Sequence, residues 1–254
     1  MLQPHSLLWH YLSVAPYVLL IVLAFSMLKR GLHKNFPAFF CYVIFEAVGG
    51  TLIYAIDVSP SVSAPMYWWS YFFFLIVEVF VKFVVIGEVF THLLLHYPPL
   101  GKLAKLLISG VGIVLIFAAT IIAAYANPTT FWIISAARIL GRSVSVVLCG
   151  LVLFLFVFAA HFSLRWQRSV FGIALGFGIS ASVYLAHWAI VAAWLFGQKS
   201  YLLDFVIMAT YQLCVLVWLY YLLIPQKIVA RTAVLVPKHN LELWNRELER
   251  LIQQ

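Results

Sequence analysis

Seven long apolar runs, separated by short polar connections, organise most of this 254-residue chain. The runs cover residues 6–28, 36–57, 67–96, 103–126, 130–163, 169–196 and 201–224. At about 1.5 Å per residue in an α-helix, each run is long enough to cross the roughly 30 Å of hydrocarbon in a bilayer. The pattern predicts an all-α polytopic membrane protein, in which a bundle of seven transmembrane helices over residues 1–224 is followed by a tail over residues 225–254.

Lys and Arg gather in alternate connections and in the tail. Those in the first, third and fifth connections and in the tail are Lys29, Arg30, Lys34, Lys102, Lys105, Arg165, Arg168, Lys227, Arg231, Lys238, Arg246 and Arg250. The N-terminus and the remaining connections hold only Lys199. Basic residues that flank membrane spans favour the cytoplasmic side. We therefore expect a multi-pass membrane protein with the N-terminus outside and the C-terminus in the cytoplasm.

Composition excludes a water-soluble domain, because 65% of the residues are hydrophobic and only 9% are charged. The net charge of +8 is explained by this topology and by contact with anionic lipid headgroups, so no nucleic-acid partner is expected. The three cysteines lie within apolar runs and form no Cys-x-x-Cys pattern, which argues against a disulfide framework or a zinc ribbon.

The run 169–196 contains small residues at four-residue spacing: Gly172, Gly176 and Ser180. On a helix these residues share one face, and small side chains let a second helix approach closely. We expect this face to be a packing surface.

The tail contains one amphipathic segment over residues 240–254. Its apolar residues fall on one helical face, with Asn240 as a suitable N-cap, and they are Leu241, Trp244, Leu248, Leu251 and Ile252. Such a helix either lies on the inner membrane surface as an anchor or docks a cytoplasmic or membrane protein partner.

Ionisable side chains inside the apolar runs are the candidates for function, because each costs about 2.5–3.5 kcal/mol at the centre of a span unless it is paired or hydrated. In the run 67–96 they share a helical stripe about 120° wide. They are Glu78, Lys82, Glu88, His92 and His96. This stripe must face the bundle interior or a watery cavity, and Glu78 and Lys82 have the spacing of an i,i+4 ion pair.

Other runs supply charged and polar partners for this stripe: Glu46, Arg138, Arg142, His187, Asp204 and Tyr211. Counted from the outer ends of their spans, Glu46, Glu78 and Arg142 lie about eleven or twelve residues deep and Arg138 about eight, which predicts a shared level in the bundle for all four. Three interpretations remain open. The charges form an internal salt-bridge network, or they bind a small polar or anionic ligand through the guanidinium groups, or the carboxylates form an ion or proton path.

The spacing of Glu88, His92 and His96 also allows one helix to offer three ligands to a metal ion. Interfacial histidines are the simpler explanation of so short a pattern. Haem is not favoured, because His161 projects away from the face that the other residues share. The sequence lacks a G-x-S-x-G motif, a P-loop and a GxGxxG motif, so soluble-enzyme chemistry is not supported.

Several short motifs carry a resemblance to a known group of proteins. They are Asn35-Phe36-Pro37-Ala38-Phe39-Phe40 at the start of the second run, Glu78 and Glu88, and His96-Tyr97-Pro98 at the end of the third. In these the chain resembles a loose group of uncharacterised bacterial seven-helix membrane proteins. The resemblance implies seven helices and a bacterial inner membrane, and it brings no activity with it. Retinal is not expected, because the last run has no Lys for a Schiff base.

These observations favour a receptor-like or sensor-like protein that binds a small polar or anionic molecule through Arg138, Arg142, Glu46 and Glu78. The alternatives are a transporter or a proton- or ion-translocating protein that uses the same carboxylates, an accessory subunit of a membrane complex, and a metallo-enzyme at the cytoplasmic face. A non-enzymatic role is favoured over an enzymatic one, and a metal ion is the one cofactor that stays open.

Overall fold

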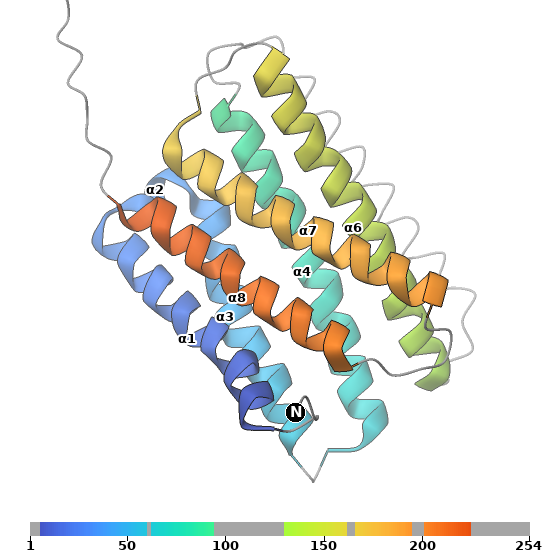
Figure 1. Ribbon diagram of the computed structural model, residues 1–254. Helices are drawn as coiled ribbons and strands as arrows, with labels where there is room; N and C mark the ends of the chain where they lie inside the picture. Colours follow the sequence, from blue (N-terminus) through green and yellow to red (C-terminus); the bar gives the residue numbers. More distant parts are fainter. Residues whose placement is uncertain (1–5, 60–61, 94–129, 162–165, 195–200, 225–254) are drawn as a thin grey trace, which may run out of the picture. The chain divides into compact units, whose positions relative to one another are not determined.

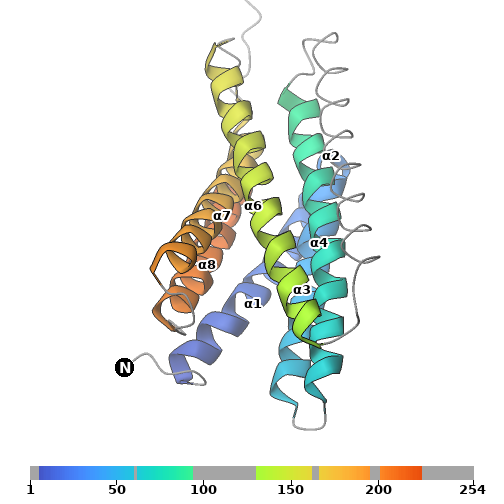
Figure 2. The ribbon, with the colours of Figure 1, turned by 90° about the vertical axis from the view of Figure 1, so that its right-hand side faces the viewer.

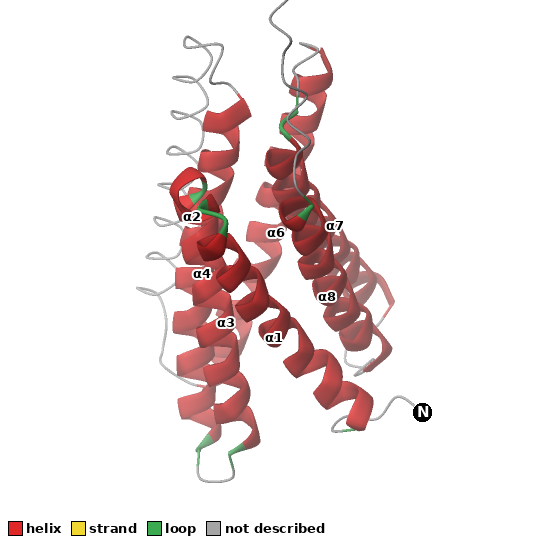
Figure 3. Ribbon diagram, turned by 90° about the vertical axis from the view of Figure 1, so that its left-hand side faces the viewer, coloured by secondary structure: helices red, strands yellow, loops and turns green. Residues whose placement is uncertain are grey.

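The computed structural model describes residues 6–59, 62–93, 130–161, 166–194 and 201–224. In these segments the regular structure is helical throughout, without a strand (Figure 3). The described residues up to Leu223 pack as one unit. The all-α prediction is confirmed for this part of the chain. The predicted span over residues 103–126 and the tail over residues 225–254, with its amphipathic segment, lie outside the described residues.

Seven helices are described, and their ends lie close to the ends of the apolar runs. They are α1 (Leu7–Lys29), α2 (Leu32–Asn35), α3 (Pro37–Val58), α4 (Ala64–Leu93), α6 (Thr130–His161), α7 (Arg168–Trp194) and α8 (Tyr201–Leu223). Within the described residues, five segments are long and apolar enough to cross a membrane: Leu7–Lys29, Pro37–Val58, Ile139–His161, Arg168–His187 and Tyr201–Leu223. The protein is therefore a multi-pass membrane protein in contact with a lipid bilayer.

The six long helices pack in a closed circuit. α1 lies against α3 and α8, α3 against α4, α4 against α6, α6 against α7, and α7 against α8. α4 and α7 also touch across the circuit. Figure 1 and Figure 2 show this order from two directions. One face of each long helix thus turns toward a shared interior.

An aromatic cluster fills part of this interior and joins α3, α7 and α8. It consists of Phe39, Tyr42, Phe177 and Trp218, whose ring centroids lie between 5.1 and 6.4 Å apart. The indole N–H of Trp218 donates to the carbonyl of Ile173 at 3.3 Å, so its polar end is satisfied as well. Side chains of this size hold the three helices in one arrangement.

The outward faces carry large apolar side chains that are exposed: Val18, Ile21, Phe25, Phe73, Phe80, Leu153, Val157, Leu213 and Tyr220. A water-soluble protein rarely exposes so much contiguous apolar surface. Lipid tails are as apolar as these side chains, so the outward faces are suited to hydrocarbon.

Gly172 and Gly176 let α8 approach α7 closely. A Cβ atom on Gly172 would lie 2.2 Å from the Cβ of Tyr221, and one on Gly176 would lie 2.1 Å from the indole nitrogen of Trp218. Both separations are far shorter than the roughly 3.5–4.0 Å of an optimal carbon contact. The packing face predicted from the four-residue spacing is confirmed for these two glycines.

We expect Gly176→Val to lower the free energy of unfolding by about 1–3 kcal/mol, because the added atoms overpack the contact with Trp218. The matched control is Gly150→Val on α6, where a Cβ atom would meet nothing within 4 Å. This control carries the same change of helix propensity. Reversible unfolding in mixed micelles measures both variants, and equal losses would contradict the close α7–α8 contact.

Candidate functional site

Glu46 lies on the inner face of α3, and only 5% of its surface is exposed. The phenol of Tyr211 on α8 donates to its Oε2 atom at 3.3 Å. Its Oε1 atom is buried and accepts no hydrogen bond from a described donor, and the carboxylate of Glu78 lies within hydrogen-bond reach of Glu46. Leaving a buried polar atom unsatisfied is unfavourable. A proton or a hydrogen-bond donor at Oε1 would therefore stabilise the site.

Glu78 and Lys82 form an ion pair one turn apart on α4, with the ammonium donating to Oε1 of Glu78. This is the i,i+4 arrangement expected from their spacing. The pair is partly exposed, with 18% of the Glu78 side chain and 17% of the Lys82 side chain accessible. Glu46 is repelled by Glu78 and attracted to Lys82. We call Glu46, Glu78, Lys82 and Tyr211 the central polar cluster.

The central polar cluster contains two carboxylates and one ammonium group. When all three groups are ionised, one negative charge remains uncompensated. The second carboxylate needs a proton, a cation or neutral donors to be stable inside a helical bundle. The charge balance therefore favours a partner that donates hydrogen bonds.

Four further tyrosines interact electrostatically with the carboxylates of the cluster. They are Tyr17 on α1, Tyr42 on α3, Tyr71 on α4 and Tyr184 on α7. With Tyr211 on α8, five helices contribute phenol groups. Each phenol both donates and accepts a hydrogen bond, so the surroundings of the cluster are polar on several sides.

Gly50 makes room for Tyr17 beside Glu46. A Cβ atom on Gly50 would lie 2.2 Å from the Tyr17 ring. Gly50 and Tyr42 stand one turn after and one turn before Glu46, so all three share a face of α3. Tyr42 and Gly50 were not predicted as parts of the site, although their four-residue spacing from Glu46 was the signal that could have found them.

Other residues proposed from the sequence lie elsewhere. Arg142 is exposed on α6 and is not brought into the cluster, and the side chain of Arg138 lies outside the described part of the chain. Asp204, exposed in the first turn of α8, and His187, near the end of α7, attract each other. Asp204 precedes Tyr211 by seven residues, about 10 Å along the helix. This pair is thus a second polar location, nearer the helix ends.

Glu88 on α4 caps the N-terminus of α3. Its Oε1 atom accepts from the backbone N–H of Ala38 at 3.0 Å, and its Oε2 atom from that of Phe39 at 2.9 Å. Pro37 opens α3 and has no N–H, so Ala38 and Phe39 carry the first N–H groups that lack an intrahelical partner. A carboxylate is also favoured at the positive end of a helix dipole. Glu88 therefore fixes where α3 meets α4.

His92 also has structural contacts. Its Nδ1 atom donates to the carbonyl of Glu88 at 2.9 Å, and its ring lies against Phe36 with 4.7 Å between ring centroids. Among the described residues, no three His, Cys, Asp or Glu side chains are placed to hold a metal ion. His96, the third predicted ligand, lies outside those residues. A metal at this site would compete with the two hydrogen bonds that Glu88 makes to α3.

We expect Glu88→Ala to lower the free energy of unfolding by about 2 kcal/mol, because two backbone donors lose a charged acceptor. Glu88→Gln keeps one acceptor oxygen and should lose roughly half as much. Amide hydrogen exchange should accelerate at Ala38 and Phe39 in both variants, most in the alanine variant. Unchanged exchange at these two amides would contradict the capping role.

Comparison with known protein families gives no matching family, and neither the curated proteins nor the solved structures give a match. The geometry of the central polar cluster is therefore the basis on which we infer a function.

Proposed function

We propose that this chain is a receptor-like or sensor-like membrane protein that binds a small polar molecule at the central polar cluster. The observation that carries the proposal is the buried Glu46 carboxylate, whose Oε1 atom accepts no hydrogen bond from a described donor. Binding sites for small molecules combine an apolar enclosure with a few placed polar groups. A donor on the ligand would satisfy this oxygen, and the neighbouring ion pair and phenol groups would orient the rest of the molecule.

The charge balance narrows the chemistry of the ligand. The sequence alone left a polar or an anionic molecule open, with Arg138 and Arg142 as the anion-binding groups. Arg142 is exposed on α6, and the cluster itself has more carboxylate than ammonium. An amine, an ammonium ion or a polyhydroxylated molecule fits this set of groups better than an anion does.

Proton or ion translocation is the second candidate, and the proximity of Glu46 and Glu78 favours it. Two carboxylates that repel each other inside a membrane protein share protons readily, and such groups often serve as relays. Proteoliposomes that contain a pH-sensitive dye distinguish the two functions. Proton flux that is lost in Glu46→Gln would support translocation, whereas binding without flux would support a receptor.

The proposed topology has seven spans. Five of them are the segments that are long and apolar enough to cross a membrane. The other two are α4 and residues 103–126. The distribution of Lys and Arg supports an outer N-terminus and a cytoplasmic C-terminus. The resemblance to bacterial seven-helix membrane proteins supports an inner-membrane location. In this arrangement the segment 240–254 faces the cytoplasm, where it could dock a protein partner that receives the signal.

A thermal-stability screen of the purified full-length protein tests the proposed binding. The panel contains primary amines, amino acids, polyols and small carboxylic acids, each at a fixed concentration in the same detergent. At least one donor-rich compound should raise Tm, because a ligand that binds only the folded state stabilises it. A response confined to carboxylic acids would contradict the proposed ligand chemistry.

A further inference from the structure

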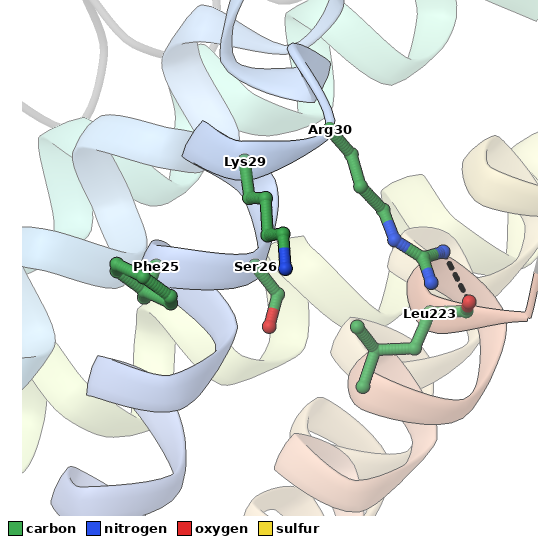
Figure 4. A pocket seen from close by; sticks show the side chains of 5 residues that line it. All are labelled: Phe25, Ser26, Lys29, Arg30 and Leu223. Atoms are coloured by element: carbon green, nitrogen blue, oxygen red, sulfur yellow. Dashed lines mark hydrogen bonds between the residues drawn. The ribbon is translucent and has the colours of Figure 1, made fainter.

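A second site, apart from the central polar cluster, lies where the end of α1 meets the end of α8. A pocket of about 440 Å³ is lined there by Phe25, Ser26, Lys29, Arg30 and Leu223 (Figure 4). The described residues of its wall thus combine two cationic side chains with two large apolar ones and include no carboxylate. Such a lining suits an anion that carries an apolar group.

Arg30 is held in place by the C-terminus of α8. Its Nη1 atom donates to the carbonyl of Leu222 at 3.3 Å and to that of Leu223. The last carbonyls of a helix lack intrahelical partners and attract cations. Gly31 follows with φ at +69°, a left-handed conformation that favours glycine, and turns the chain away directly after Arg30. The guanidinium is therefore positioned before any ligand arrives.

Several hydrogen-bond donors remain available in this pocket. A guanidinium has five N–H donors, and Arg30 uses only Nη1 toward the described residues, which leaves Nε and Nη2. Lys29 is exposed and makes no ion pair or hydrogen bond within the described segments. Ser26 gives its proton to the carbonyl of Val22 at 2.7 Å and so adds no donor. An ammonium beside a planar guanidinium fork matches the several acceptor oxygens of a phosphate group.

An exposed apolar stripe on α1 leads to the pocket. It consists of four exposed residues at helical spacing: Val18 (53% exposed), Ile21 (58%), Val22 (47%) and Phe25 (68%). Phe25 also lines the pocket. In a bilayer this stripe contacts acyl chains. A phosphate group bound by Lys29 and Arg30 is thus continuous with a surface for the hydrocarbon attached to it.

We propose that this pocket binds the phosphate group of an anionic membrane lipid, with Lys29 and Arg30 as the donors and the α1 stripe beneath the acyl chain. The site does not depend on the function proposed for the central polar cluster. By bridging the ends of α1 and α8, the bound lipid would stabilise the junction between the first and last described helices.

Native mass spectrometry of the delipidated full-length protein in mild detergent, titrated with phosphatidylglycerol and with phosphatidylcholine, tests the site. Lys29→Gln should weaken phosphatidylglycerol binding by about fivefold to tenfold. The matched control is Lys34→Gln, which removes an exposed charge on α2, outside the pocket, and should change binding by less than about twofold. Equal losses in the two variants would overturn the proposal, since the binding would then reflect diffuse surface charge.

A second arm separates a lipid headgroup from free phosphate as the source of the anion. Inorganic phosphate is added as a competitor, and Ile21→Ser places a hydroxyl in the stripe without touching the cationic wall. We expect Ile21→Ser to bind phosphatidylglycerol more weakly than the wild type does. We also expect inorganic phosphate to compete with the lipid only at high concentration. If lipid binding is unchanged in Ile21→Ser and a low concentration of phosphate displaces the lipid, the pocket is a site for free phosphate. That result would overturn the lipid assignment.

Discussion

Replacing Lys82 by methionine is expected to lower the free energy of unfolding by about 3 kcal/mol. Methionine preserves most of the side-chain volume, so packing changes little. The loss arises because Glu46 and Glu78 then lie near each other without the ammonium that attracts both. Reversible unfolding in mixed micelles, followed by tryptophan fluorescence, measures the difference.

Two further variants show whether this loss comes from the central polar cluster. Arg142→Met removes an exposed charge from α6 and should change stability by less than about 0.5 kcal/mol. Glu78→Gln combined with Lys82→Met removes the ion pair as a unit and should recover most of the stability that Lys82→Met loses. A double variant as unstable as Lys82→Met would contradict the assignment of the loss to an uncompensated carboxylate.

Glu46→Gln is expected to weaken binding of the stabilising compound by about 10- to 100-fold, which corresponds to one hydrogen bond to a charged acceptor. The amide has nearly the same shape, and it removes a buried charge, so the protein should fold at least as well as before. Isothermal titration calorimetry of each variant with the compound identified by the thermal screen measures the dissociation constant.

Asp204→Asn is a matched control for Glu46→Gln, because Asp204 is an exposed carboxylate in the first turn of α8, outside the central polar cluster. It makes the same change from carboxylate to amide and should change binding much less than Glu46→Gln does. Equal affinity in the wild type and in Glu46→Gln would place the ligand away from the central polar cluster.

The helices of the membrane domain could be predicted from the sequence because a bilayer imposes a simple rule. A span needs about twenty apolar residues, and its backbone must satisfy its own hydrogen bonds. The runs at 6–28 and 201–224 therefore correspond closely to α1 and α8. The order in which the helices surround the interior follows no such rule, since it depends on how side chains from separate helices fit together.

The grouping of Glu46, Glu78 and Lys82 could be anticipated from helical periodicity and depth. Charged side chains avoid lipid, so a shared stripe on one helix and a matching depth on another point to the interior. Arg142 satisfied the same criteria and is nevertheless exposed. Depth along a helix does not determine its rotation about the helix axis, and that rotation is decided by packing against neighbouring helices.

Glu88 shows a second reason why side-chain roles are hard to predict from the sequence. Its spacing from His92 suggested a metal ligand, because side chains four residues apart share a helical face. The structure instead directs both carboxylate oxygens to the backbone of another helix. The clue was Pro37, since a proline at the first helical position leaves the next N–H groups in need of an acceptor. Which residue supplies that acceptor depends on a tertiary contact that sequence spacing does not encode.

The most direct test of the central polar cluster is a double-mutant cycle between Glu46→Gln on α3 and Lys82→Met on α4. If the two side chains share one site, the stability change of the double variant should differ from the sum of the two single changes by about 1–3 kcal/mol. The double variant should be more stable than the additive value, because removing the Glu46 charge relieves the repulsion that Lys82→Met exposes. Changes that add to within about 0.5 kcal/mol would mean that Glu46 and Lys82 do not sense each other, and the cluster would not exist as a single binding site.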